Sequence, residues 1–216
     1  MTYLEAINKV LRRLREDEVS SPDSSAYSKL IGEFVNDANR LVEDSWDWTV
    51  LRDTSVVSGI TNTTTTFSLS GVTEQDKILG VYNITDNVEV KQGTQAGLYN
   101  STNILEAPRG RPDNYVTLNQ DTNGQLQARF YPDSDGSRVV LFNYVARTPE
   151  LTSGTDSIQV PSNVVVQFAQ AMAAEERGET GGTSSSKLYA IAQSSLSDAI
   201  AIDAGRVPTE TVWYDV

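Results

Sequence analysis

The spacing of the apolar residues changes twice along this chain, and these changes constrain its fold more than any other feature. Apolar residues recur at three- and four-residue steps over residues 4–14 and again over 27–42. This spacing is that of amphipathic helices. Thr2 followed by Glu5 fits a capping box, which indicates where the first helix begins. The pattern changes period near residue 48, and we expect the second helix to end there.

Residues 49–160 have a composition typical of β structure. Short runs rich in Val, Ile, Thr, Tyr and Phe are separated there by Gly, Asn, Asp and Pro. Residues 92–114 carry three glycines and two prolines, and we expect a long loop there. The many short antiparallel strands predict a small sandwich or barrel. The expected strands are 50–57, 65–69, 78–83, 88–91, 115–118, 126–131 and 138–145.

Helical spacing returns after Pro161, a residue that suits the first turn of a helix. A third and a fourth helix are expected over 164–175 and 188–200. The sequence therefore predicts an α+β fold, in which residues 1–48 and 161–206 form an antiparallel four-helix bundle. Residues 49–160 form an inserted antiparallel β-sandwich or barrel, and 207–216 an extended C-terminal arm. An insertion of this kind requires its two ends to lie close together.

The residue inventory argues against catalysis. The 216 residues include no cysteine and no histidine, which removes thiol nucleophiles, histidine bases and the usual zinc and haem ligands. Adjacent carboxylates such as Glu43 and Asp44 point about 100° apart on a helix and do not converge on one substrate. We expect no catalytic residue, no metal and no cofactor, although carboxylates and a Ser–Lys arrangement remain within the composition.

One motif has two interpretations. Residues 133–136, Asp-Ser-Asp-Gly, resemble the opening of a calcium loop, but they lack the distant glutamate that an EF-hand requires. Asp-Gly is also typical of tight hairpins, and we favour the turn.

The net charge of −12 is spread along the chain without a basic patch. Tight binding to DNA through its phosphates is therefore not expected. No apolar run approaches the roughly 20 residues of a membrane helix, and the first residues do not resemble a secretory signal. We expect a soluble protein that is assembled in a cytoplasm.

Three groups of residues are candidates for interaction. Aromatic side chains around the helix-to-strand change are expected to form a hydrophobic seam between bundle and β domain, with a sugar-stacking platform as the alternative. A basic pair in the long loop could contact a protein partner or phosphate, and the net charge favours the protein. Aromatic residues in the C-terminal arm suggest docking on a partner. The seam residues are Tyr27, Phe34, Trp46 and Trp48, the loop residues are Arg109 and Arg111, and the arm residues are Val212, Trp213 and Tyr214.

The order of elements resembles the tail tubular protein A family of short-tailed phages and, more loosely, the head-tail adaptors of long-tailed phages. The likeness is carried by the paired N-terminal helices, by Asp-Ala-Asn-Arg-Leu-Val-Glu-Asp-Ser-Trp-Asp-Trp at 37–48, and by the closing helices around 168–178 and 188–202. In that family a long helix likewise runs into a Trp-x-aromatic step before the β region.

The resemblance implies a structural adaptor at the head-to-tail junction of a virion. It implies a self-assembled ring of 12 copies between the portal protein and the tail nozzle protein, with DNA passing through the channel without specific binding. The helical part would seat on the portal, the β domain would face the nozzle, and 207–216 would bind the portal through Trp213 and Tyr214. Carboxylates lining such a channel would repel DNA phosphates.

Other functions stay open from sequence alone. The chain could be a different virion part, such as a stopper or a tail-completion protein. It could be a carbohydrate-binding β module on a helical support, with Tyr99 or Tyr115 as exposed aromatics. The absence of catalytic motifs disfavours an enzyme.

Overall fold

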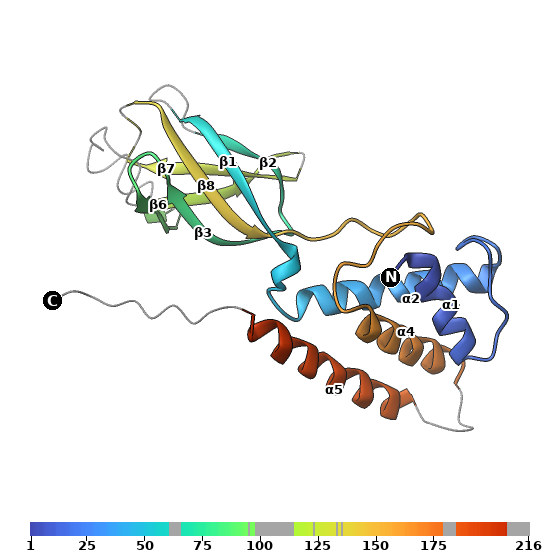
Figure 1. The fold of residues 1–216 in the computed structure, drawn as a ribbon. Coiled ribbons are helices and arrows are strands. Elements are labelled where there is room, and N and C mark those ends of the chain that lie inside the picture. Colours follow the sequence, from blue (N-terminus) through green and yellow to red (C-terminus); the bar gives the residue numbers. More distant parts are fainter. Residues whose placement is uncertain are drawn as a thin grey trace. The chain divides into compact units, whose positions relative to one another are not determined.

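The chain forms two compact units, one helical and one built of strands. A computed structural model describes residues 1–60, 66–94, 96–97, 115–122, 124–132, 134, 136–178 and 185–206. The first unit joins Met1–Leu51 to Thr148–Val216, and the second is Arg52–Arg147 (Figure 1). The fold class is α+β, with four α-helices and two sheets in the described residues.

Helix α1 spans Tyr3–Arg13 and begins where its capping box predicts. The Glu5 amide donates to the Thr2 hydroxyl at 3.3 Å, and the Thr2 amide donates to the Glu5 carboxylate at 2.9 Å. Two of the backbone amides that a helix start leaves unpaired are thereby satisfied. Ile7, Val10 and Leu11 are buried on one face, as the apolar spacing predicts.

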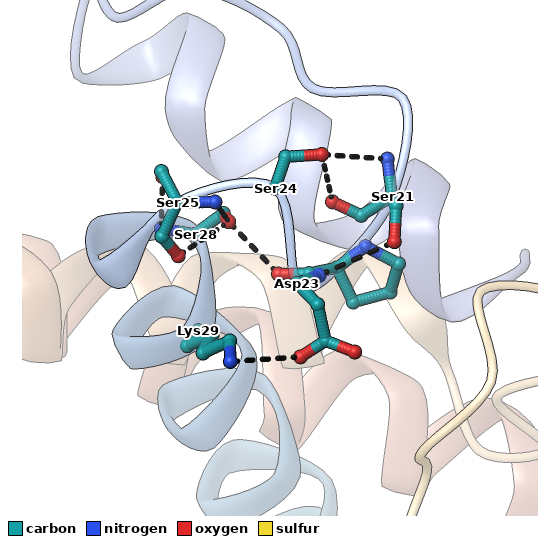
Figure 2. A network of polar contacts seen from close by, with 7 residues as sticks. Ser21, Asp23, Ser24, Ser25, Ser28 and Lys29 are labelled. Atoms are coloured by element: carbon teal, nitrogen blue, oxygen red, sulfur yellow. Dashed lines mark hydrogen bonds and ion pairs between the residues drawn. The ribbon is translucent and has the colours of Figure 1, made fainter.

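Helix α2 spans Ala26–Asp44 and begins in a network of serines (Figure 2). Ser25 and Ser28 exchange hydrogen bonds, with each backbone amide donating to the other residue's hydroxyl. The buried Ser28 hydroxyl also lies 2.8 Å from the Pro22 carbonyl oxygen, while Lys29 pairs with Asp23 at the surface. Serine therefore occupies both positions of a capping box that more often has Glu or Gln at the second.

Helix α4, Ser162–Glu176, is the centre of the helical unit and packs against α1, α2 and α5. It follows Pro161 directly, as predicted. Three consecutive residues, Val164, Val165 and Val166, are all buried, which happens only when a helix has neighbours on several sides. Helix α5, Ser185–Ala204, packs on α4, and its Ala192 and Leu196 are buried.

The β unit contains two four-stranded sheets that share one hydrophobic core. Their strand orders are β1–β8–β3–β4 and β2–β7–β6–β5. Phe130 of the second sheet and Phe142 of the first have ring centroids 6.1 Å apart within this core. The strands are β1 Arg52–Ile60, β2 Phe67–Thr73, β3 Lys77–Asn83, β4 Val88–Glu89, β5 Lys91–Gln92, β6 Tyr115–Gln120, β7 Gln125–Tyr131 and β8 Arg138–Val145.

Each of the seven expected strand regions contains a strand, with two corrections. The run expected at 88–91 is two short strands, because Val90 is buried and the chain passes there from one sheet to the other. Moreover β5 pairs with β6 in parallel, whereas all strands were expected to be antiparallel. Parallel neighbours need a connection of a dozen or more residues, and residues 93–114 are long enough to provide it.

The returning chain at 148–160 belongs with the helices, although its composition placed it in the β domain. Leu151, Ile158 and Val160 are buried in the helical unit. The Ile158 amide donates to the Met1 carbonyl at 3.0 Å. At the other boundary residues Thr49–Leu51 form a short 3₁₀ helix, so the strand expected from 50 begins at Arg52.

A buried polar row on α2 holds this returning chain. The Asn36 side-chain amide donates to the Leu151 carbonyl at 3.0 Å, and the Leu151 amide donates to Asn36 Oδ1 at 3.1 Å. One turn and two turns further along α2, Asn39 and Glu43 both contact Thr148. The row therefore fixes the point at which the chain re-enters the helical unit.

Replacing Asn36 tests this row. Asn36→Ala removes both partners of the buried Leu151 backbone, and we expect the free energy of unfolding to fall by about 2–3 kcal/mol. The measurement is urea unfolding followed by circular dichroism at 222 nm. The matched control is Asp37→Ala at the exposed neighbouring position, which should change stability by less than about 0.5 kcal/mol. Equal stability of the two variants would refute the role of Asn36.

Candidate docking site

The C-terminal end of α5 is fixed by one buried carboxylate, that of Asp203. Asp203 is only 4% exposed. Its oxygens accept hydrogen bonds from the Thr49 hydroxyl at 2.6 Å, the Thr49 amide at 3.0 Å and the Trp46 indole at 3.2 Å. Arg206 lies 3.7 Å away at the surface. The segment that follows α2 is thus joined to the end of α5.

The electrostatics of Asp203 follow from these contacts. Burial disfavours the charged carboxylate, but the hydrogen bonds from Thr49 and Trp46 and the nearby Arg206 outweigh it, and the pKa of Asp203 is lowered. The carboxylate is therefore charged at neutral pH and acts as an acceptor for three donors.

A groove of about 470 Å³ lies beside this carboxylate, within the helical unit. Buried Trp48, Ile158 and Val160 contribute to its lining. Val50 and Ile202 also line it and are 55% and 63% exposed. Pockets of roughly 300–1,000 Å³ with mainly apolar walls and a few polar groups are typical of binding sites. Asp203 and Arg206 are the charged residues of this lining.

The predicted seam residues lie in two separate places along α2. Trp46 and Trp48 are together at its end, where the Trp48 indole donates to the Val42 carbonyl at 2.7 Å and Trp46 donates to Asp203. Tyr27 lies at the other end, with the Arg177 guanidinium 4.6 Å from its ring centroid. Phe34 is half-buried between them. The four side chains do not form one cluster, and their role as a seam stays a prediction.

The other predicted residues lie outside the described part of the chain. They are the loop pair Arg109 and Arg111, the arm residues Val212, Trp213 and Tyr214, and both aspartates of the 133–136 motif. Among the residues that the structure describes, no group of three acidic side chains is arranged to hold a metal ion. Glu43 is buried while Asp44 is exposed, so these adjacent carboxylates have different surroundings.

The β unit has an exposed apolar row of its own. Val56 of β1 and Tyr82 of β3 flank Leu141 of β8 in register, and they are 56% and 41% exposed. The Tyr82 ring lies across Gly80, where an added Cβ would come within 3.0 Å of it. A cavity of about 350 Å³ beside this row is also lined by Asp53 and Asn143.

Comparison with known proteins decides the family. The family model described as SU10 adaptor protein matches residues 1–211, which include the described parts of both units. The chain belongs to the SU10 adaptor family. This is a family of structural phage adaptors rather than of enzymes, so the chain is a virion component. No curated protein matches the chain.

The residues that build the groove were not among the candidates expected from the sequence. Asp203 lies beyond the helix expected over 188–200 and was given no role, and Val50 was expected to begin a strand. The available signal was a carboxylate on the apolar stripe of α5, seven residues after Leu196.

None of the described helices is long and apolar enough to cross a membrane.

Asp203→Asn tests whether the carboxylate fixes α5. Asparagine leaves one acceptor for three donors, and we expect a loss of about 1–3 kcal/mol of unfolding free energy at pH 7. The folded-state pKa is lowered, so the charged carboxylate stabilises the fold above the unfolded pKa of about 3.9, and this stability disappears as the pH falls through the folded value. The difference between the two proteins should therefore shrink below about pH 4.

The measurement is urea unfolding at a series of pH values, followed at 222 nm. Asp198→Asn, an exposed change on the same helix, is the control and should be neutral at every pH. A difference between wild type and Asp203→Asn that stays constant down to pH 3 would contradict the assignment.

Proposed function

We propose that this protein joins head to tail in its phage, as a ring between the portal and the tail nozzle through which DNA passes. The observation that carries the proposal is the family match over residues 1–211. The match covers both the helices and the inserted strands, which supports a role in the adaptor for both parts of the chain. The order of elements also supports a likeness to tail tubular protein A, with about 12 copies implied by that resemblance.

In this proposal the helical unit is a four-helix bundle that seats on the portal. The exposed α5 residues Ile191 and Ile202 support an interaction at this helix, since large exposed apolar side chains gather at contact surfaces. Residues 207–216 bind the portal, with Trp213 and Tyr214 as anchors.

The β unit, with its two sheets as a sandwich, faces the tail nozzle. The exposed Val56 and Tyr82, which flank the half-buried Leu141, form a surface suited to a protein partner. The net charge of −12 supports a channel that does not retain DNA, because carboxylates repel phosphates. A channel lined by neutral or basic residues would remove this explanation without removing the ring.

Co-assembly with the portal protein tests the proposal. The full chain should join purified portal particles as a ring in negative-stain images, whereas a chain truncated after Gly205 should lose at least tenfold in portal binding. A full-length chain with Val212, Trp213 and Tyr214 changed to Ala should behave like the truncated one, while Thr209→Ala with Thr211→Ala is the matched control. If the truncated chain bound the portal as well as the full chain does, residues 207–216 would not be the portal-binding segment. Binding only to portals that already carry another ring would indicate a stopper or tail-completion protein.

The cavity beside Tyr82 favours one second candidate, a carbohydrate-binding module. An exposed aromatic ring next to the carboxylate of Asp53 and the amide of Asn143 is a suitable surface for stacking on a sugar. This alternative predicts that a glycan array retains the full chain and that Tyr82→Ala lowers retention at least tenfold, while Val56→Ala does not. If the glycan array does not retain the unsubstituted chain, the carbohydrate-binding alternative is excluded.

A further inference from the structure

The groove at the end of α5 presents an apolar surface that a monomeric subunit would have to leave in water. Val50 and Ile202 are more than half exposed beside the buried side chains of Trp48, Ile158 and Val160. Exposed apolar area costs roughly 25 cal/mol per Å² relative to burial. Burial of an apolar segment in this groove would therefore lower the free energy of the subunit.

The chain supplies such a segment immediately after the groove. Arg206 is both a lining residue and the last residue before 207–216, a stretch that contains Val-Trp-Tyr at positions 212–214. Six residues span at most about 20 Å when extended. The lining residues of α5 run from Ala199 to Arg206, a rise of about 10 Å. Val212 and the two residues after it can therefore reach any part of the groove.

Charge also fits this occupant. Glu210 and Asp215 flank the apolar triplet, and the segment carries no cation. The Arg206 side chain at the margin of the groove is 67% exposed and can donate to an acidic residue as well as to Asp203. Asp203 itself is buried beneath its three donors, which limits its repulsion of the segment.

We propose that in the free subunit this groove binds the chain's own residues 207–216 through the side chains of Val212, Trp213 and Tyr214. A short tether gives an effective concentration in the millimolar range, well above that of a second subunit at micromolar concentration, so the segment binds its own groove. The free subunit thereby covers its apolar surface. The inference does not depend on portal binding, because it concerns the chain alone.

Competition with a peptide tests the inference without any portal. The probe is a fluorescein-labelled peptide of residues 207–216, measured by fluorescence polarisation. In the full-length chain with Val212, Trp213 and Tyr214 changed to Ala the groove is vacant, and this chain should bind the peptide at least tenfold more tightly than the unsubstituted chain does. A peptide with Trp replaced by Ala should bind neither.

Two exposed isoleucines of α5 provide a matched pair for locating the site. Adding Ile202→Asp to the triple variant should weaken binding of the peptide at least tenfold, because Ile202 lines the groove. Ile191→Asp on the same helix, 52% exposed and outside the groove lining, should leave binding unchanged. Val50→Asp provides a second change in the groove, and circular dichroism at 222 nm shows that each variant is folded.

Three outcomes would overturn the inference. In the first, the peptide does not bind the triple variant. In the second, it binds the triple variant and the unsubstituted chain equally. In the third, Ile191→Asp and Ile202→Asp weaken binding of the peptide equally. Light scattering after size exclusion identifies the remaining occupant, a second copy. A dimer of the unsubstituted chain that the triple variant does not form would place the segment in a neighbouring groove and refute binding within one subunit.

Discussion

An inserted unit can be accommodated only if the chain returns close to the place it left, and buried polar side chains on α2 secure that return. Asn36 bonds both backbone groups of Leu151, while Asn39 and Glu43 contact Thr148. An apolar face alone would hold the returning segment without fixing its register, because hydrophobic contact has no direction. Hydrogen bonds to a buried backbone specify one register, since any shift leaves polar groups unpaired.

The same principle operates at the other side of the insertion. Asp203 accepts three hydrogen bonds from the segment that leads out of α2, and α5 is positioned by them. Helix α5 has fewer buried apolar residues than α4, so this polar attachment is a large share of what holds its end. The groove exists because α5 is held at that end by a carboxylate while Val50 and Ile202 stay exposed. Structural attachment and candidate docking site thus depend on the same residue.

Much of the fold could be predicted from local patterns. The capping box of Thr2 and Glu5, the start of α4 after Pro161 and the regions of the strands all follow from interactions between residues close in sequence. The predictions are wrong where contacts between residues distant in sequence determine the structure. The segment 148–160 was expected to belong to the β domain, but its backbone pairs with residues 1–4 and with Asn36. The run at 88–91 divides because Val90 is buried between two sheets.

The candidate site divides in the same way. The sequence by itself determined two helical ends around a β insertion, an acidic chain without cysteine or histidine, and the presence of Trp213 and Tyr214 among its last residues, because these depend on composition and local periodicity. Only the tertiary structure decided that Trp46, Thr49 and Asp203 meet, more than 150 residues apart in sequence, and that Val50 and Ile202 line one groove. A carboxylate on an apolar stripe indicates a buried partner but does not identify it. The packing of α5 on α4 brings that partner within reach.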